Sequence, residues 1–189
     1  MNVYDFDKTI YEGDSTLDFY LYCLKKHPNI IKCMPRQIWA GVKYKLNFID
    51  KTQFKEEFYS FLSKLKNVDD DLESFWNLYQ KKIKKWYKQN QKSNDVVISA
   101  SPDFLLKIIC EREGINSLIA SKVDKKSGKY FGKNCYGEEK VKRFKETYKK
   151  YEIEVFYSDS YSDQPMADIS RTSYIVNGET VQKWNKKYN

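Results

Sequence analysis

The chain has 189 residues, of which 41% are hydrophobic and 16% aromatic, and its formal net charge is +8. This apolar content excludes a disordered chain and leaves room for one core domain of ordinary size plus an insertion. No apolar run is long enough to cross a bilayer and the N-terminus enters a strand at once, so we expect neither a transmembrane span nor a signal peptide, and a cytoplasmic protein.

The first predicted element is a short buried strand over residues 1–6. Asp5 lies at its end and Asp7 directly follows it. Where a strand ends and the chain turns, two such carboxylates can converge on one ion and one phosphorus. A pair at this edge of a sheet is typical of magnesium-assisted phosphoryl transfer, in which one aspartate attacks and the other handles the proton. Taken alone, the same pattern is also typical of a solvated turn.

Residues 15–94 differ from the rest of the chain in their sequence pattern, because their apolar residues recur with a helical period. We predict a four-helix cap domain inserted over the active site, with hinges at Gly13 and at residues 89–94. Ser15 to Asp18 resembles a capping box that starts the first of these helices. The predicted domains are therefore a core of residues 1–14 and 95–189 and a helical cap domain of residues 15–94.

The excess positive charge lies entirely in residues 15–94, which carry 16 Lys+Arg against 8 Asp+Glu, whereas the rest of the chain has 18 of each. One interpretation is a solvated lysine-rich surface. A second is that a cluster of lysines steers anionic substrates or docks the cap domain on an anionic membrane. A third is nucleic-acid binding, with Trp86 and Tyr87 stacking on bases, although no recognised motif supports it. The cluster consists of Lys81, Lys82, Lys84, Lys85 and Lys88.

After the insertion, residues 95–100 form a continuous apolar run that predicts a buried strand delivering Ser99 to the sheet edge. Pro102 then suits the start of a helix over 103–113, whose N-terminus favours a phosphate.

The four cysteines (Cys23, Cys33, Cys110 and Cys135) are scattered without a CxxC pair, so we expect reduced thiols in apolar positions rather than a disulfide or zinc site.

The last third of the chain supplies two more polar strand ends. A strand is predicted over 117–121 and a short one over 129–135, before Gly137 opens a helix with Lys140 in its first turn. A cation there opposes the helix dipole, which indicates a nearby anionic partner. A strand over 154–158 is followed by Asp159 and Asp163. The last strand, 172–176, is closed by Gly178 and Glu179, with fraying expected from Gln182 to Asn189.

Strands separated by helices predict an α/β fold: a doubly wound parallel sheet flanked by helices. Attack of a carboxylate on a phosphomonoester dianion requires the residue types found at the strand ends. A metal ion and the Lys140 ammonium neutralise charge so that Asp5 can approach. Asp7 must donate a proton and later accept one, which suits a carboxyl whose pKa is raised by crowding with Asp5 and Asp159.

Taken together, the four motifs resemble those of haloacid dehalogenase superfamily phosphatases, of the subclass that includes phosphoserine phosphatase. Asp5 to Thr9 matches the Asp-x-Asp-x-Thr signature, and Ser99, Lys140 and the Asp159/Asp163 pair match the other motifs over essentially the whole chain. The resemblance implies that Asp5 is a nucleophile forming an aspartyl-phosphate and that Asp7 is the acid and base. It also implies that Mg²⁺ is held by Asp5, the Asp7 main-chain carbonyl, Asp159 and Asp163, while Ser99 and Lys140 bind the phosphoryl oxygens.

Each of these residues also has an ordinary structural interpretation: Asp163 as a helix cap, Ser99 as a strand-end hydroxyl and Lys140 as a surface lysine. Asp14 lies where the resemblance places a substrate-binding glutamate, and it is equally suited to start a helix.

The arginine that grips a substrate carboxylate in phosphoserine phosphatases has no clear counterpart. The cap domain has only Arg36, with Lys51 and Lys55 at the expected place. We therefore predict a magnesium-dependent phosphomonoesterase for a small phosphorylated metabolite. The alternatives are a lipid-phosphate phosphatase of the phosphatidylglycerophosphate type at a membrane surface and, from another class, a non-enzymatic basic binding module.

Overall fold

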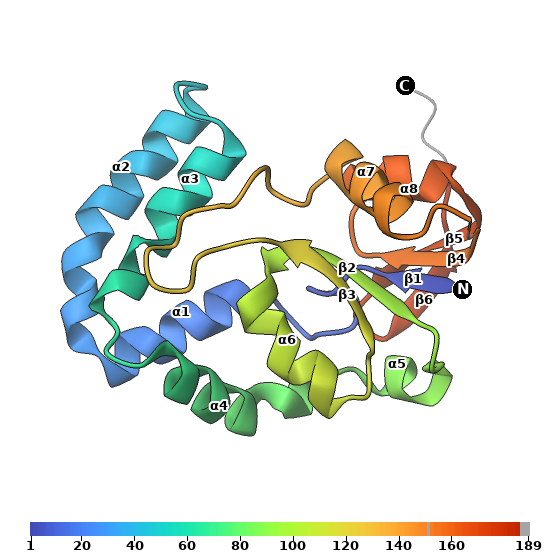
Figure 1. Ribbon diagram of the computed structural model, residues 1–189, viewed down its shortest axis with the longest axis horizontal. Coiled ribbons are helices and arrows are strands. Elements are labelled where there is room, and N and C mark those ends of the chain that lie inside the picture. Colours follow the sequence, from blue (N-terminus) through green and yellow to red (C-terminus); the bar gives the residue numbers. More distant parts are fainter. Residues whose placement is uncertain (151, 186–189) are drawn as a thin grey trace.

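The computed structural model describes residues 1–150 and 152–185. A six-stranded sheet lies at its centre, with strand order β3-β2-β1-β4-β5-β6 (Figure 1). The strands are β1 (Asn2–Tyr4), β2 (Val96–Pro102), β3 (Ser117–Ser121), β4 (Ile153–Ser158), β5 (Ser170–Asn177) and β6 (Thr180–Lys183). The α-helices are α1 (Ser15–Lys26), α2 (Met34–Lys45), α3 (Lys51–Phe58), α4 (Val68–Tyr79), α5 (Lys85–Asn90), α6 (Asp103–Arg112), α7 (Glu138–Thr147) and α8 (Gln164–Asp168). Four 3-10 helices join them: η1 (Pro28–Cys33), η2 (Tyr59–Lys64), η3 (Gln80–Lys82) and η4 (Tyr161–Asp163).

The strands β1 to β5 pair in parallel, and β6 is antiparallel to β5. The predicted doubly wound sheet is confirmed. The chain first builds outward from β1 through β2 to β3, then returns and builds through β4 to β5 on the other side. The direction of winding thus reverses between β1 and β4, and a crevice opens beyond the carboxyl ends of strands at such a point.

Alternate residues of the central strands enter two different cores, because successive side chains of a strand point to opposite faces. Val3 packs on the side of α7 and α8, whereas its neighbour Tyr4 packs on the side of α5 and α6. The same alternation along β2 sends Val96 and Ile98 to the first side and Val97 to the second. The sheet is therefore covered on both faces, which explains the uninterrupted apolar runs in its strands.

The inserted helices do not all stand apart from the core. In Figure 1, α2 and α3 project to one side, α4 lies below α1 and beside α6, and α5 lies below the sheet. The indole of Trp76 in α4 donates a hydrogen bond to the Leu105 carbonyl in α6 at 2.7 Å, and the ring of Tyr87 in α5 meets Tyr4 of β1 edge to face at 5.0 Å. The domain boundary at residue 94 stays a prediction, and α5 contributes its buried rings to the core.

Two expectations about the later segments were wrong. Residues 129–135 form no strand; they make a single bridge, between Tyr130 and Val123. This segment instead contacts the inserted helices: Tyr130 donates its main-chain N–H to Glu56, and its ring centre lies 6.2 Å from that of Tyr59. Just before it, a Cβ at Gly128 would meet the Tyr59 main chain at 2.6 Å. Gly178 and Glu179 do not close the sheet either, because they turn the chain into β6. Within the predicted frayed tail, Gln182 and Lys183 belong instead to β6 and Trp184 is buried, while residues 186–189 lie outside the described residues.

Within the described part of the chain, all four cysteines are buried and free, as predicted. No helix among the described residues has the length and apolar character needed to cross a bilayer.

Trp76 ties α4 to α6 and is fully buried. We expect Trp76→Ala to lower the free energy of unfolding by about 3–5 kcal/mol, because it removes a large core side chain and leaves the Leu105 carbonyl without its donor. Urea denaturation followed by circular dichroism measures this. Leu78→Ala on the same helix is the control, since Leu78 is 57% exposed. Equal losses in the two variants would contradict the role of Trp76 as a link between α4 and the core.

Candidate active site

The polar strand ends predicted from the sequence meet at the carboxyl edge of the sheet. Asp5 directly follows β1 and stays attached to the neighbouring strand, because its N–H donates to the Tyr157 carbonyl at 2.9 Å. Asp159 follows the end of β4 in the same way. Asp5, Asp7, Ser99, Lys140 and Asp159 all line one cavity of about 260 Å³. Asp14 and Asp163 line it too. The cavity lies at the point where the winding of the sheet reverses.

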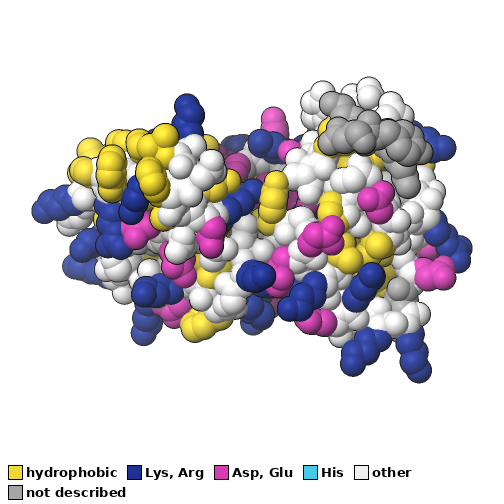
Figure 2. All heavy atoms as spheres, turned by 90° about the horizontal axis from the view of Figure 1, so that it is seen from above, with side chains coloured by type: hydrophobic (Ala, Val, Ile, Leu, Met, Phe, Trp, Pro, Cys, Tyr) yellow, Lys and Arg dark blue, Asp and Glu magenta, His cyan; other side chains and the backbone are white. Residues whose placement is uncertain are grey.

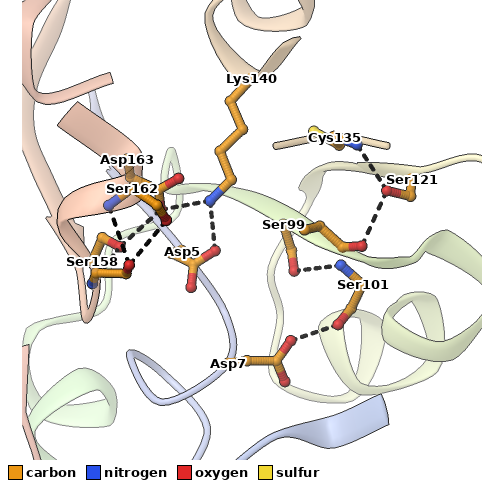
Figure 3. A network of polar contacts seen from close by, with 12 residues as sticks. Asp5, Asp7, Ser99, Ser101, Ser121, Cys135, Lys140, Ser158, Ser162 and Asp163 are labelled. Atoms are coloured by element: carbon orange, nitrogen blue, oxygen red, sulfur yellow. Dashed lines mark hydrogen bonds and ion pairs between the residues drawn. The ribbon is translucent and has the colours of Figure 1, made fainter. Parts of the chain in front are cut away.

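Lys140 is the centre of the charged network (Figure 3). Its ammonium group donates to Asp5 Oδ1 and to Asp163 Oδ2, both at 2.7 Å, and Ser158 Oγ donates to the same Asp163 oxygen at 2.8 Å. Only 2% of the Lys140 side chain is exposed. The interpretation of Lys140 as a surface lysine is therefore wrong. Its place in the first turn of α7 is explained by the two carboxylates it binds.

The charges of this network are unbalanced. Burial raises the pKa of Asp5 to about 7 despite the attraction of Lys140. Burial alone would lower the pKa of Lys140, but the attraction of Asp5 and Asp163 outweighs it, and the net shift is upward. Two carboxyl groups thus share one ammonium, so the network contains one more acidic group than basic groups. Asp163 Oδ1 is also buried and has no hydrogen-bond partner.

This surplus fits a divalent cation. Mg²⁺ takes oxygen ligands and is commonly bound by one or two carboxylates together with waters and substrate phosphate, rather than by a complete protein cage. No group of three or more His, Cys, Asp or Glu side chains in the described residues is close enough together to form a complete metal site. Burial also raises the pKa of Asp159, beside Asp163. Asp163 Oδ1 is the buried oxygen that a cation could use, and Asp5 and Asp159 lie in the lining of the same cavity.

Asp7 is held by two donors from other elements. Its Oδ1 accepts the N–H of Ser15 at 2.6 Å, and its Oδ2 accepts the hydroxyl of Ser101 at 2.5 Å. Burial raises the pKa of Asp7 to about 6, and the nearby charge of Asp14 adds to the shift. We expected crowding by Asp5 and Asp159 to raise this pKa, but the main causes are burial and the charge of Asp14. A carboxyl with a pKa this close to neutrality is suited to both giving and taking a proton.

Ser101 is a site residue that the sequence reasoning missed. It lies two residues beyond Ser99 at the end of β2, where register with β3 shifts. Ser99 Oγ accepts the N–H of Ser101 at 3.1 Å, so the first serine orients the second. Thr16 Oγ1 lies 3.1 Å from Ser101 Oγ and extends the chain of hydroxyls into α1. The Ser-Ala-Ser alternation was the available signal, since residues i and i+2 share a face of a strand.

Asp14 lines the cavity and also caps α1. Its Oδ1 accepts the N–H of Leu17 at 2.9 Å, so Asp14 is the N-cap and the capping box predicted at Ser15 was wrong. A capping box is present instead at Asp50 and Gln53, at the start of α3. Asp163 occupies the N-cap position of α8 but makes no capping hydrogen bond with its side chain, which is turned to Lys140.

The helix α3 brings two further cations to the cavity, Lys51 and Lys55. Lys55 Nζ donates to the Ala100 carbonyl at 2.8 Å and to Asn134 Oδ1 at 3.2 Å, and forms no ion pair with a described residue. Burial lowers the pKa of Lys55 to about 8. Lys51 Nζ lies 3.2 Å from the centre of the Tyr136 ring. Arg36 is elsewhere, on the outside of α2, where it pairs with Glu57.

The lysine cluster of residues 81–88 is not a continuous free surface. Lys82 pairs with Asp18 at 2.7 Å, and Lys88 pairs with Glu113 at 2.9 Å. Lys84 is buried, and its ammonium donates to the carbonyls of Lys8 and Gly178. Trp86 and Tyr87 are buried among the rings of Tyr4 and Tyr157, so they cannot stack on bases.

The model of the haloacid dehalogenase-like hydrolase family matches residues 3–168, which is most of the chain and includes every residue of the site described above. The chain belongs to this hydrolase family. No curated protein matches its sequence at a significant level.

Solved structures share the fold of this family member at low sequence identity. A protein of unknown function from Bordetella pertussis Tohama I has a TM-score of 0.70 at 18% identity, covering 89% of this chain and 85% of its own. A phosphoserine phosphohydrolase-like protein from Francisella tularensis has a TM-score of 0.57 at 14% identity, with coverages of 92% and 86%. A phospho-aspartyl intermediate analogue of phosphoserine phosphatase has a TM-score of 0.53 at 17% identity, with coverages of 90% and 83%.

Lys140→Met should destabilise the protein, because it leaves Asp5 and Asp163 buried without a cation. We expect a loss of about 3–5 kcal/mol at neutral pH. The loss should shrink as the pH falls, because the folded variant then takes up protons on carboxyls whose pKa exceeds the unfolded value. Urea denaturation at about pH 5 and about pH 8 measures both effects. Lys142→Met on the same helix is the control, since Lys142 is 66% exposed. A pH-independent loss would contradict the charge argument.

Proposed function

We propose that this hydrolase is a magnesium-dependent phosphomonoesterase that forms an aspartyl-phosphate on Asp5 and acts on a small phosphorylated metabolite. The observation that carries the proposal is the buried ammonium of Lys140 between Asp5 and Asp163, at the edge of a cavity that also holds Asp7 and Ser99. An anionic nucleophile held beside a fixed cation is the arrangement that attack on a phosphate dianion requires.

In the first half-reaction, a carboxylate oxygen of Asp5 forms a bond to phosphorus while the bond from phosphorus to the ester oxygen breaks. Asp7, which has a pKa of about 6, gives its proton to the departing oxygen. In the second half-reaction, water attacks phosphorus and loses its proton to Asp7, and the bond between phosphorus and Asp5 breaks. Inorganic phosphate leaves, and both aspartates regain their initial states.

The remaining groups bind the phosphoryl oxygens and keep the acid and base in place. Lys140 offers a charged donor and Ser99 a neutral one, while Ser101 and the Ser15 N–H fix the orientation of the Asp7 carboxyl. Asp5, Asp159, Asp163 and the Asp7 main-chain carbonyl would hold Mg²⁺. When bound, the ion supplies charge neutralisation for the phosphate and for the carboxylates around it.

The substrate class follows from the size and charge of the cavity. A volume of about 260 Å³ favours a small phosphomonoester, and Lys51 and Lys55 offer positive charge from the inserted helices. No arginine is among the described residues that line this cavity, so it differs from the site of the phosphoserine phosphatases, in which an arginine grips the substrate carboxylate. Family membership and the assembled site disfavour a non-enzymatic basic module. A cytoplasmic location remains part of this proposal.

Asp5→Asn is expected to reduce turnover of phosphomonoesters by roughly a thousandfold or more while the fold is retained, because an amide is no nucleophile. The assay uses a panel of small phosphomonoesters with Mg²⁺, with EDTA, and with Mg²⁺ restored. Acid quenching and mass spectrometry of the wild type should locate one phosphoryl group on Asp5. Asp69→Asn is the control, because Asp69 is exposed.

Two results would overturn the covalent, metal-dependent proposal. One is activity of Asp5→Asn above about a tenth of the wild type, which corresponds to only about 1.4 kcal/mol of barrier. The other is full activity of the wild type in excess EDTA.

Lys55 provides a separate test of the substrate side of the cavity. Because burial lowers its pKa to about 8, Lys55 loses its charge as the pH rises through this value, and kcat/KM for an anionic substrate should fall there. Lys55→Arg, which stays charged, should abolish this fall. Lys55→Met should raise KM more than it lowers kcat. An alkaline fall that persists in Lys55→Arg would assign it to another group.

A further inference from the structure

One side of α2 and its flanking turns exposes large apolar side chains. Trp39 is 61% exposed and Phe48 75% exposed, and four aliphatic residues beside them are at least 40% exposed. We call this surface the α2 face; it consists of Ile31, Ile38, Trp39, Val42, Leu46 and Phe48. Figure 2 shows yellow side chains gathered at the end of the molecule that α2 and α3 form in Figure 1. A contiguous apolar surface of this kind marks an interaction site.

The α2 face is a consequence of helical spacing. Ile38, Val42 and Leu46 follow one another at intervals of four residues, with Trp39 beside them, so they share one side of the helix. The opposite side is buried: Gln37 accepts a hydrogen bond from Tyr20 at 2.9 Å and donates one to the Phe58 carbonyl at 2.8 Å. The helix buries only Gln37 and Ala40, while its large apolar residues face outward, whereas a typical surface helix buries its apolar side.

The charges around the α2 face have one sign. Residues 28–49 contain Lys32, Arg36, Lys43 and Lys45 and no acidic residue. Arg36 is neutralised by Glu57 of α3, whereas the three lysines make no ion pair with a described residue. Exposed apolar residues bordered by unpaired lysines are the pattern of helices that lie in the interface of anionic membranes.

We propose that the α2 face docks on the surface of an anionic lipid bilayer, with the axis of α2 in the plane of the membrane. A second copy of the chain is a poorer match. A twofold contact would bring the lysines of one α2 face toward those of the other without any acid from residues 28–49. An anionic headgroup layer offers the complementary charge, and its acyl boundary accepts the apolar side chains. Trp39 belongs to the residue type that concentrates at membrane interfaces.

Docking through α2 leaves the catalytic residues free. Their groups come from the sheet edge, α7 and α3, and none of the residues of the α2 face lines the cavity. α2 packs on α3, which carries Lys51 and Lys55, so the membrane would lie one helix away from the substrate cavity. The proposal is independent of the proposed function, because binding is measured without turnover.

Cosedimentation with phosphatidylcholine vesicles, with and without phosphatidylglycerol, tests the proposal. We expect the wild type to bind the phosphatidylglycerol vesicles and to lose binding as salt is raised. Trp39 reports its own insertion, because Trp76, Trp86 and Trp184 are buried. Its emission should shift to shorter wavelength on anionic vesicles, and Trp39→Phe should remove the shift.

Two triple variants separate the apolar and charged contributions. Ile38→Ser/Val42→Ser/Leu46→Ser and Lys32→Glu/Lys43→Glu/Lys45→Glu should each weaken vesicle binding by at least about tenfold. Matched triple controls carry changes of the same kind elsewhere: Leu21→Ser/Leu78→Ser/Phe131→Ser and Lys81→Glu/Lys85→Glu/Lys126→Glu alter exposed side chains outside the α2 face and should bind like the wild type. Circular dichroism spectra and thermal unfolding curves establish that each variant is folded.

Three results would overturn the proposal. The first is failure of the wild type to bind phosphatidylglycerol vesicles at low salt. The second is undiminished binding by either triple variant. The third is a dimer in sedimentation velocity that is lost in the apolar triple variant, together with no vesicle binding, which would assign the α2 face to a second copy of the chain.

Discussion

The site depends on one buried ammonium group. Taking Lys140, Asp5 and Asp163 out of water costs several kcal/mol for each charge, and this cost is offset only when the geometry of the contacts is close to ideal. Two donor-acceptor distances of 2.7 Å meet that condition. Because the three residues come from the end of β1, the start of α7 and η4, their contact links those elements at the edge of the sheet. This pairing of charges therefore helps to hold the shape of the crevice beyond the sheet.

The same network explains why the two acidic residues near β1 differ in their surroundings. Asp5 lies against a cation, whereas Asp7 receives only neutral donors, from Ser15 and Ser101. The Lys140 ammonium orients Asp5 and offsets part of the cost of its burial, although burial still raises the pKa of Asp5 to about 7. Neutral donors orient Asp7, and burial raises its pKa to about 6, so Asp7 can exchange a proton near neutral pH. Two carboxyls separated by one residue thus acquire different chemistry from the elements that pack against them.

The features that the sequence made predictable were local ones. Apolar runs indicated β2 and β4, and a polar residue at the end of each run was enough to place Ser99 and Asp159 at one edge. Contacts between distant parts of the chain were not predictable in this way. Ser101 and Asp7 are 94 residues apart, and Lys55 and Ala100 are 45 apart. The segment 129–135 was expected to form a strand, but its partners are Glu56 and Tyr59, which no periodicity indicates.

Lysines of the inserted helices show how far composition can mislead. In the sequence they form a single excess of positive charge, but in the structure their burial and their partners place them in three different environments. Lys84 is buried against main-chain carbonyls, Lys55 faces the cavity with a lowered pKa, and Lys43 and Lys45 border an apolar face on the far side of the same helical layer. A steering field would act through all of them at once. The structure instead separates lysines that line the cavity from lysines that border Trp39. In the two proposals made above, the first group attracts an anionic substrate and the second favours an anionic surface.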